Sequence, residues 1–277
     1  MKKRTKIIPI TAGILLLIII SAGIYTYNAI FKPFDHPETV YIYIDEEKSY
    51  DKVIDQLQEK AGIPNERIFN LLADRMKYIN NIKTGRYAIK PGTTMLDAIR
   101  LLRSGVQEPV NLTFNNIRNM ESLAGRLSSQ LMTDSLSLLE ALTNPDIAAG
   151  YGFNSQTFGA MFIPNTYQVY LDTSVKGLTD RMKKEYDAFW NSNRKKRAEE
   201  IGLTPLEVST LASIVEEEAT YADEYPIVAG LYLNRIKRGM RLEADPTVKF
   251  AVGDPTLRRI LFKHLEVESP YNTYKND

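Results

Sequence analysis

An uncharged apolar stretch that runs from Ile7 to about Tyr27 is the strongest constraint on how this chain folds. At about 1.5 Å per residue, a helix of this length spans a hydrocarbon layer of about 30 Å. A cleaved signal peptide is the competing interpretation, but its apolar region is usually shorter, and no small-residue cleavage site closes this stretch clearly. We therefore expect an uncleaved anchor. Positive charges precede the stretch, at Lys2, Lys3, Arg4 and Lys6. They predict that residues 1–30 form a cytoplasmic tail and a transmembrane helix, with the remainder extracytoplasmic.

Composition excludes several classes of chemistry. The chain has 277 residues, enough for two modest domains, and its net charge of +1 gives no nucleic-acid surface. It contains no cysteine, and its two histidines, His36 and His264, lie far apart in sequence. Thiolate zinc sites are excluded, and a histidine-rich metal site or a histidine-dependent triad loses support. Carboxylate chemistry remains open, and we expect neither a metal nor a cofactor.

Residues 40–107 predict a small α+β module that follows a linker at 31–39. In order, its predicted elements are a strand at Val40–Ile44, helices opened by Ser49 and Asn65, a strand at Gly85–Ile89, and a helix from Thr94 to Gly105. Such a module could hold a glycan in a shallow groove, or it could be a spacer. We favour spacing or binding over catalysis, because no buried ionisable cluster is predicted in it.

Residues 108–277 predict a mostly helical α+β domain. Its predicted elements are a strand at Val110–Phe114, helices at Met120–Leu131, Ser135–Leu142, Val175–Ile201 and Tyr225–Ile236, and a short helix from Asp245. The segment Met161–Tyr170 is predicted as an aromatic turn after Pro164, which either lines a sugar site or fills a corner of the core. The apolar residues expected on the last long helix are Ile227, Val228, Leu231, Leu233 and Ile236.

The segment from Thr204 to Tyr221 carries the most informative pattern. Thr204, Pro205 and Glu207 are typical of a helix start with a capping box. At about 100° per residue, with Leu211 as the reference, Glu218 lies at roughly −20°, on the apolar face, and Glu216 at roughly +140°. A carboxylate on a buried face favours its neutral form, as a general acid requires. The alternative is that Glu218 swings into solvent or pairs with an arginine.

Several strings of residues together resemble one known family, the endolytic murein transglycosylases of the MltG or YceG-like type. They are Leu211–Thr220 (LASIVEEEAT), Leu233–Arg235, Gly239–Leu242, Ala244–Val248 (ADPTV) and Ser269–Tyr274 (SPYNTY). The anchor, the strand Gly85–Arg86–Tyr87 and the segment Phe162–Tyr167 fit as well, so the resemblance covers nearly the whole chain. It implies a LysM-like module over about 40–107 and a transglycosylase catalytic domain over 108–277. Family members continue past SPYNTY, so we expect this domain to be truncated at its carboxyl end.

The resemblance also implies the chemistry and the site. The second glutamate of the family's IVExE string falls on Glu218, the catalytic candidate, and the first on Glu216, the runner-up. One carboxylate would protonate the oxygen between N-acetylmuramic acid and N-acetylglucosamine and then deprotonate the muramic C6 hydroxyl, which leaves a 1,6-anhydro end. Glu216 and Glu218 project to opposite sides of the helix, so they cannot form the facing carboxyl pair of ordinary glycosidases. Motif residues that would contact sugars are Asn234, Asp245, Thr247, Tyr271, Asn272 and Tyr274.

The resemblance implies a bacterial single-pass protein of the inner membrane, with its catalytic domain in the periplasm. Its partners would be peptidoglycan strands and peptidoglycan synthases. Two other functions stay open. One is a non-catalytic peptidoglycan-binding or scaffold protein of the wall-synthesis machinery. The other is a muramidase that uses water, which needs a second carboxylate such as Asp245 opposite Glu218. Arg235 or Arg241 is expected to hold Glu216 or Glu243 in a structural ion pair.

Overall fold

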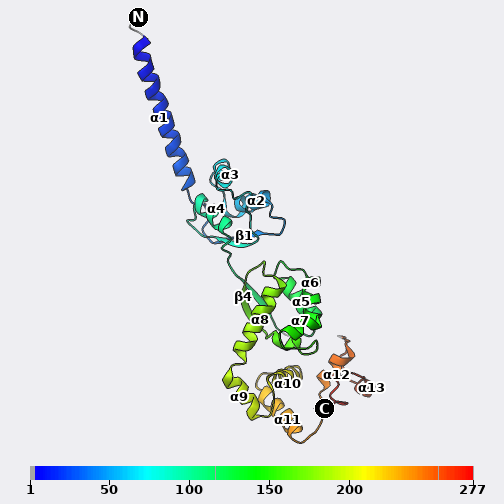
Figure 1. The fold of residues 1–277 in the computed structure, drawn as a ribbon. Helices are drawn as coiled ribbons and strands as arrows, with labels where there is room; N and C mark the ends of the chain where they lie inside the picture. Colours follow the sequence, from blue (N-terminus) through cyan, green and yellow to red (C-terminus); the bar gives the residue numbers. More distant parts are fainter. Residues whose placement is uncertain (1–3, 116, 255, 277) are drawn as a thin grey trace. The chain divides into compact units, whose positions relative to one another are not determined.

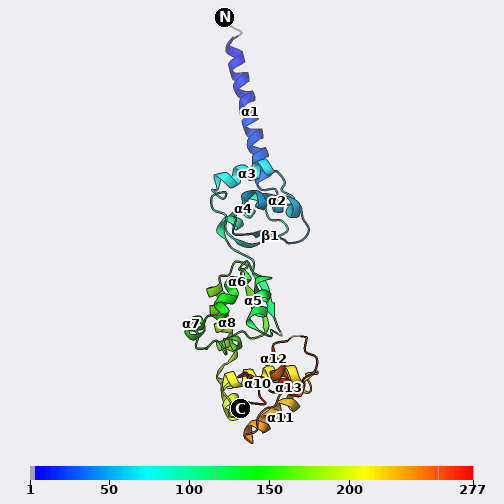
Figure 2. The ribbon, with the colours of Figure 1, turned by 90° about the vertical axis from the view of Figure 1, so that its right-hand side faces the viewer.

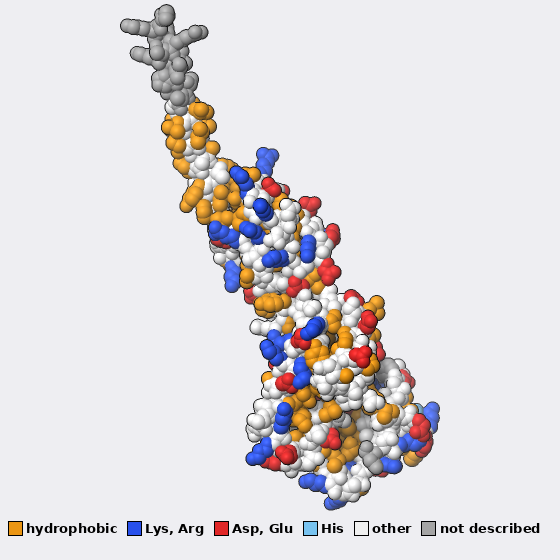
Figure 3. Space-filling model, viewed as in Figure 1, with side chains coloured by type: hydrophobic (Ala, Val, Ile, Leu, Met, Phe, Trp, Pro, Cys, Tyr) orange, Lys and Arg blue, Asp and Glu red, His pale blue; other side chains and the backbone are white. Residues whose placement is uncertain are grey.

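The computed structural model describes residues 4–115, 117–254 and 256–276, a mixed α+β chain with mostly helical content (Figure 1). Helix α1 (Arg4–Ile30) is apolar and long enough to cross a membrane, with a mean hydropathy of 1.9 over Gly13–Ile30. Figure 3 shows apolar side chains covering the described part of this helix. The expected amino-terminal helix is confirmed, while Lys2 and Lys3 of its basic flank lie outside the described residues.

Contacts divide the chain into two compact units. The first comprises Met1–Ala141 with Pro164–Leu178, and the second comprises Leu142–Ile163 with Thr179–Asp277. The chain thus passes from the first unit into the second at residue 142, returns to the first unit at residue 164, and enters the second unit again at residue 179. The domain boundaries expected from the sequence, at 30, 39 and 107, stay predictions.

In the first unit, the elements after α1 match the sequence-based expectations. They are β1 (Val40–Ile44), α2 (Tyr50–Ala61), α3 (Glu66–Arg75), β2 (Gly85–Ile89) and α4 (Met95–Ser104). Strands β1 and β2 pair antiparallel, with Ile42 opposite Tyr87, and both side chains are buried. The predicted caps Ser49, Asn65 and Thr94 each accept a hydrogen bond from a backbone N–H in the first turn. Local capping chemistry therefore sets the start of every helix in this module.

The segment expected to be a linker is pinned to this module. Phe34 is only 3% exposed and lies in the core cluster, where its ring meets Phe69 of α3 edge-on at 6.4 Å. Its backbone N–H donates to the carbonyl of Thr93 at 3.0 Å. The chain is thus packed into the module four residues after α1 ends.

A second two-stranded sheet also belongs to the first unit. Strand β3 (Val110–Phe114) has the predicted bounds, and it pairs antiparallel with β4 (Asn165–Val169). The prediction of an aromatic turn over this part of the chain is wrong, because Asn165–Val169 is a strand. Its Tyr167 is buried and stacks on Phe114 at 5.5 Å. The long-range partner β3, rather than local sequence, makes this segment extended. Helices α5 (Met120–Ser128) and α6 (Ser135–Thr143) lie between the two strands in sequence.

The second unit is helical. Its elements are α7 (Pro145–Gly150), the 3₁₀ turn η1 (Phe158–Met161), α8 (Val175–Phe189, in this unit from Thr179), α9 (Ser192–Glu200), α10 (Pro205–Glu218), α11 (Tyr225–Lys237), α12 (Asp245–Val252) and α13 (Phe262–Leu265) (Figure 2). The prediction of one helix over 175–201 is wrong. The helix is interrupted before Asn191. The side chain of Asn191 accepts a hydrogen bond from the N–H of Arg194 at 3.0 Å and so caps α9. The break follows Trp190, which is buried.

Replacing this cap tests the break between α8 and α9. We expect Asn191→Ala to lower the free energy of unfolding by about 1 kcal/mol, because the first turn of α9 loses its side-chain acceptor. Urea unfolding of the detergent-solubilised chain, followed by the fluorescence of Trp190, the sole tryptophan, measures the change. Asn193→Ala, at an exposed position inside α9, is the matched control. Equal losses for both variants would contradict the assignment of Asn191 as the cap.

Candidate active site

Helix α10 supplies the catalytic candidate. The capping box is present as predicted: Thr204 Oγ1 accepts from the N–H of Glu207 at 3.3 Å, and the Glu207 carboxylate accepts from the N–H of Thr204 at 2.7 Å. This fixes where the helix begins and so which residues share a face. Leu211, Ile214 and Val215 are buried in one cluster, which confirms the predicted apolar face.

Glu218 is the last residue of α10, and its side chain is exposed. The predicted burial of this carboxylate is therefore wrong. The packed part of the face ends at Val215, one turn earlier, and Ala219 already has an extended backbone. Burial by its own helix face therefore does not prepare Glu218 for proton transfer. Glu216 is exposed too, on another side of the helix.

Tyr232 of α11 connects the apolar cluster to Glu218. Its side chain is 4% exposed and packs with Ile214 and Val215 of α10. Its hydroxyl lies close enough to the Glu218 carboxylate for the charge of Glu218 to act on it. Burial, and then the negative charge of Glu218, raises the pKa of Tyr232 to about 12, so the phenol is neutral and keeps its proton for a hydrogen bond. Glu218 lies one helical turn beyond Ile214 and Val215, where these apolar residues do not cover its carboxylate.

A second tyrosine and carboxylate pair lies nearby. Asp245, the first residue of α12, accepts a hydrogen bond from the hydroxyl of Tyr274 at 2.8 Å. Burial and this hydrogen bond raise the pKa of Tyr274 to about 12, with smaller contributions from Glu243 and Glu218. The charge of Asp245 also acts on Tyr232. Glu218 and Asp245 therefore share one electrostatic environment that contains two neutral phenols.

An arginine framework supports the loop before α12. Arg235 forms an ion pair with Glu243 and donates from Nε to the carbonyl of Arg241 at 2.6 Å. Arg241 in turn donates to the carbonyl of Tyr274 at 3.1 Å. Glu243 has a φ of +51°, a left-handed conformation that is uncommon for a residue with a side chain. The expected structural pairing of Glu243 with an arginine is confirmed, and Arg235 is the partner.

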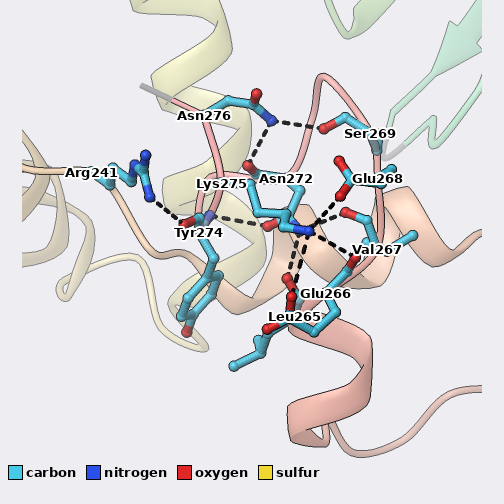
Figure 4. A network of polar contacts seen from close by, with 10 residues as sticks. All are labelled: Arg241, Leu265, Glu266, Val267, Glu268, Ser269, Asn272, Tyr274, Lys275 and Asn276. Atoms are coloured by element: carbon cyan, nitrogen blue, oxygen red, sulfur yellow. Dashed lines mark hydrogen bonds and ion pairs between the residues drawn. The ribbon is translucent and has the colours of Figure 1, made fainter.

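Two of the predicted sugar-binding residues, Asn272 and Thr247, hold the carboxyl-terminal segment in place. Asn272 is fully buried, and its amide nitrogen donates to the carbonyls of Leu265 and Val267, both at 2.8 Å (Figure 4). Its amide oxygen accepts from the N–H of Tyr274 at 3.0 Å. Thr247, also buried, bonds through its hydroxyl to that of Thr273 at 2.9 Å. Both therefore position Tyr274 and the start of α12. Their direct contact with a sugar stays a prediction.

Tyr271 and Asn234, which were also predicted to bind sugar, are exposed. Tyr271 packs edge-on against Phe250 at 5.0 Å and leaves 42% of its surface open. Asn234 is exposed on α11. Sequence reasoning missed Tyr232 because it placed Ile227 and Leu231 inside, and both are more than half exposed. A helical stripe that starts at Tyr225 would have included Tyr232.

A groove of about 370 Å³ lies at the other end of α10, where Thr204, Pro205 and Leu206 contribute to its wall. A helix of 14 residues is about 20 Å long, so this groove is remote from Glu218. Tyr151 and Lys183, which also line it, already bind Asp180 and Asp187. We therefore place the candidate site at the Glu218 end. Among the described residues, no three His, Cys, Asp or Glu side chains are grouped as a metal site would need.

The architecture and the motif residues define the class of protein. A family model described as the YceG-like family matches residues 42–277, and the chain belongs to this family. An endolytic murein transglycosylase of Bacillus subtilis (strain 168) is 26% identical over 261 residues, which cover 87% of this chain and 71% of that protein. An endolytic murein transglycosylase of Streptococcus pneumoniae serotype 2 is 25% identical over 257 residues. The matched residues cover 79% of this chain and 45% of that protein.

The fold is similar to a solved structure as well. The crystal structure of a putative YceG-like protein from Listeria monocytogenes has a TM-score of 0.54 and 24% sequence identity, covering 86% of this chain and 83% of that one. This similarity supports the mixed α+β fold.

The phenol of Tyr232 gives the site a measurable dependence on alkaline pH. Its folded pKa of about 12 lies above the ordinary value of 10.0, so between these values the unfolded chain releases a proton that the folded chain retains. Stability contributed by this group is present below pH 10 and lost as the pH rises towards 12. We expect Tyr232→Phe to show a smaller fall in urea midpoint over this range than the parent chain. An identical fall would contradict the burial of the phenol.

Proposed function

We propose that this chain is a membrane-anchored murein transglycosylase, a lyase that cuts peptidoglycan strands between N-acetylmuramic acid and N-acetylglucosamine. Glu218 is the single general acid and base, and the product carries a 1,6-anhydromuramic end. The proposal is supported by membership of the YceG-like family and by two relatives named endolytic murein transglycosylase. The observation that carries it is the position of the buried Tyr232 phenol beside the exposed carboxylate of Glu218.

The reaction balances with one carboxyl group. Protonated Glu218 gives its proton to the bridging oxygen while the bond from that oxygen to C1 of the muramic acid breaks. The C6 oxygen of the same sugar bonds to C1, and its proton passes to the Glu218 carboxylate. The carboxyl group is thereby restored, and no water is consumed. Because the nucleophile belongs to the substrate, this reaction needs no second catalytic carboxylate.

Tyr232 decides which carboxyl oxygen reacts. In the proposed mechanism the neutral phenol donates a hydrogen bond to one oxygen of Glu218, so a proton on the carboxyl group resides on the other oxygen. That second oxygen is the one that faces the substrate in this mechanism. Tyr232 touches no substrate in this scheme and acts as a positioning residue. Asp245, held by Tyr274, contributes negative charge beside the oxocarbenium-like centre that forms at C1.

The first unit would bring the enzyme to its substrate. We propose that β1, α2, α3 and β2 form a LysM-like glycan-binding module, an idea supported by two helices connecting two antiparallel strands. We also propose that α1 anchors the chain in the inner membrane with everything after it in the periplasm, beside peptidoglycan synthases. Exposed Tyr271, packed on Phe250, offers an aromatic face to a sugar of the strand.

A hydrolytic reaction is the second candidate. It is favoured by one observation, that Glu218 and Asp245 act on the same two phenols, which brings a second carboxylate into the site. A muramidase would use Asp245 to activate water or to bond to C1. Mass spectrometry separates the two reactions, because a hydrolytic product is heavier by one water.

Replacement of the acid tests the proposal directly. We expect Glu218→Gln to lower the release of anhydromuramyl ends from purified murein by about 100-fold or more, because an amide cannot donate this proton. Glu216→Gln, an equal change two residues earlier, should retain most activity. If both variants and the parent release no anhydro ends yet bind murein alike, the chain is a binding or scaffold protein and the proposal fails.

Removal of one hydroxyl tests the positioning role. We expect Tyr232→Phe to lower kcat by about 10- to 100-fold with little change in KM, because a hydrogen bond to a charged group is lost while the ring keeps its packing. Tyr225→Phe, at a partly buried tyrosine of the same helix, is the control. A normal kcat in Tyr232→Phe would remove this residue from the mechanism.

A further inference from the structure

The end of the anchor helix and the module that follows are separated by very little chain. Helix α1 ends at Ile30, and Phe34 is already buried in the module core. Four residues span at most about 14 Å even when fully extended. The headgroup layer on each side of a hydrocarbon core is about 5 to 8 Å thick. A module tethered this closely to a membrane helix has to lie against the membrane surface.

Helix α3 is the element of this module that faces α1. The two helices are in contact, and Asn65, the residue that caps α3, donates from its side-chain nitrogen to the hydroxyl of Tyr25 at 3.3 Å. Figures 1 and 2 both show α3 beside the end of α1. Tyr25 and Tyr27 are each 63% exposed near that end of α1, where tyrosines typically lie at the level of lipid headgroups.

The outer face of α3 has the composition of a membrane-surface helix. Arg67, Leu71 and Arg75 follow one another at intervals of four residues and lie on one side of the helix. Leu71 is 59% exposed, although its neighbour Leu72 packs against the core. Lys77 lies two residues after Arg75, and the exposed Glu66 and Asp74 offset two of these three positive charges. An exposed leucine between arginines suits an interface of acyl chains and anionic phosphates.

We propose that the outer face of α3, formed by Arg67, Leu71 and Arg75, rests on the membrane and binds anionic phospholipid headgroups. This inference depends on the proposed role of α1 as an anchor. The module is then fixed at the lipid surface by two contacts, the anchor itself and α3. The hydrogen bond between Asn65 and Tyr25 joins α3 to the anchor helix.

A chain with no cysteine allows a direct test by site-specific labelling. Single variants Leu71→Cys, Ile18→Cys and Leu136→Cys each receive an environment-sensitive fluorophore in the full chain. Leu136, 77% exposed on α6, is the matched surface leucine, and Ile18 reports the middle of α1. The labelled proteins are reconstituted in phosphatidylglycerol vesicles that carry nitroxide quenchers at shallow or deep positions.

Shallow quenching at position 71, at least about threefold stronger than at position 136, together with deep quenching at position 18, supports the proposal. Deep quenching at 18 with equal quenching at 71 and 136 overturns the role of α3 and leaves the anchor standing. If position 18 is not quenched either, the anchor and the inference both fall.

Charge is tested by Arg67→Gln with Arg75→Gln in the Leu71→Cys background. In phosphatidylglycerol vesicles, we expect the equilibrium constant for binding of α3 to the lipid surface to fall about fivefold for each arginine that is replaced. In phosphatidylcholine vesicles we expect little change. Lys195→Gln with Lys196→Gln, an equal charge loss on exposed positions of α9, is the control. Equal effects of the two double variants, or of the two lipids, overturn the headgroup-binding part of the proposal.

Discussion

The contact between Tyr232 and Glu218 is the interaction on which the candidate site depends. The ring is part of the cluster that joins α10 to α11, while the hydroxyl lies at the end of α10 against a carboxylate. The capping box at Thr204 sets the start of α10, and a shift of one residue would turn Glu218 by about 100° away from the phenol. The packing that stabilises this pair of helices is thus also what orients the proposed acid.

A buried amide performs a similar task at the other side of the site. Both protons of the Asn272 nitrogen are bound to carbonyls, and its oxygen binds the N–H of Tyr274. A buried polar group with all its partners in place specifies one backbone path, since any other path leaves it unpaired. This path brings the hydroxyl of Tyr274 to Asp245. The SPYNTY string therefore contributes one phenol to the site, and part of its remaining chemistry maintains the loop.

Several elements defined by local chemistry could be predicted from the sequence, although the equally local cap at Asn191 was missed. The caps at Ser49 and Thr94 and the capping box at Thr204 are bonds within three residues, so the helix starts they give agree with the structure. Strands β1, β2 and β3 could be predicted because their own residues favour extended structure, whereas two features set by distant partners could not. Strand β4 needs β3, which lies more than fifty residues earlier, and the inward face of α11 is chosen by α10 around Tyr232.

The exposure of Glu218 could not be predicted either. A helical wheel gives the direction in which a side chain points, but it does not show how far the elements packed on that face of the helix extend. An open carboxylate nevertheless suits a polymer substrate better than a buried one, since a glycan strand cannot enter a closed pocket. Water is then displaced when a sugar ring covers the site, and the electrostatic contacts strengthen at that moment. A neutral phenol that already lies beside the carboxylate needs little rearrangement to bind one of its oxygens when this happens. Orientation by Tyr232, rather than burial, is what prepares Glu218 for proton transfer in the proposed mechanism.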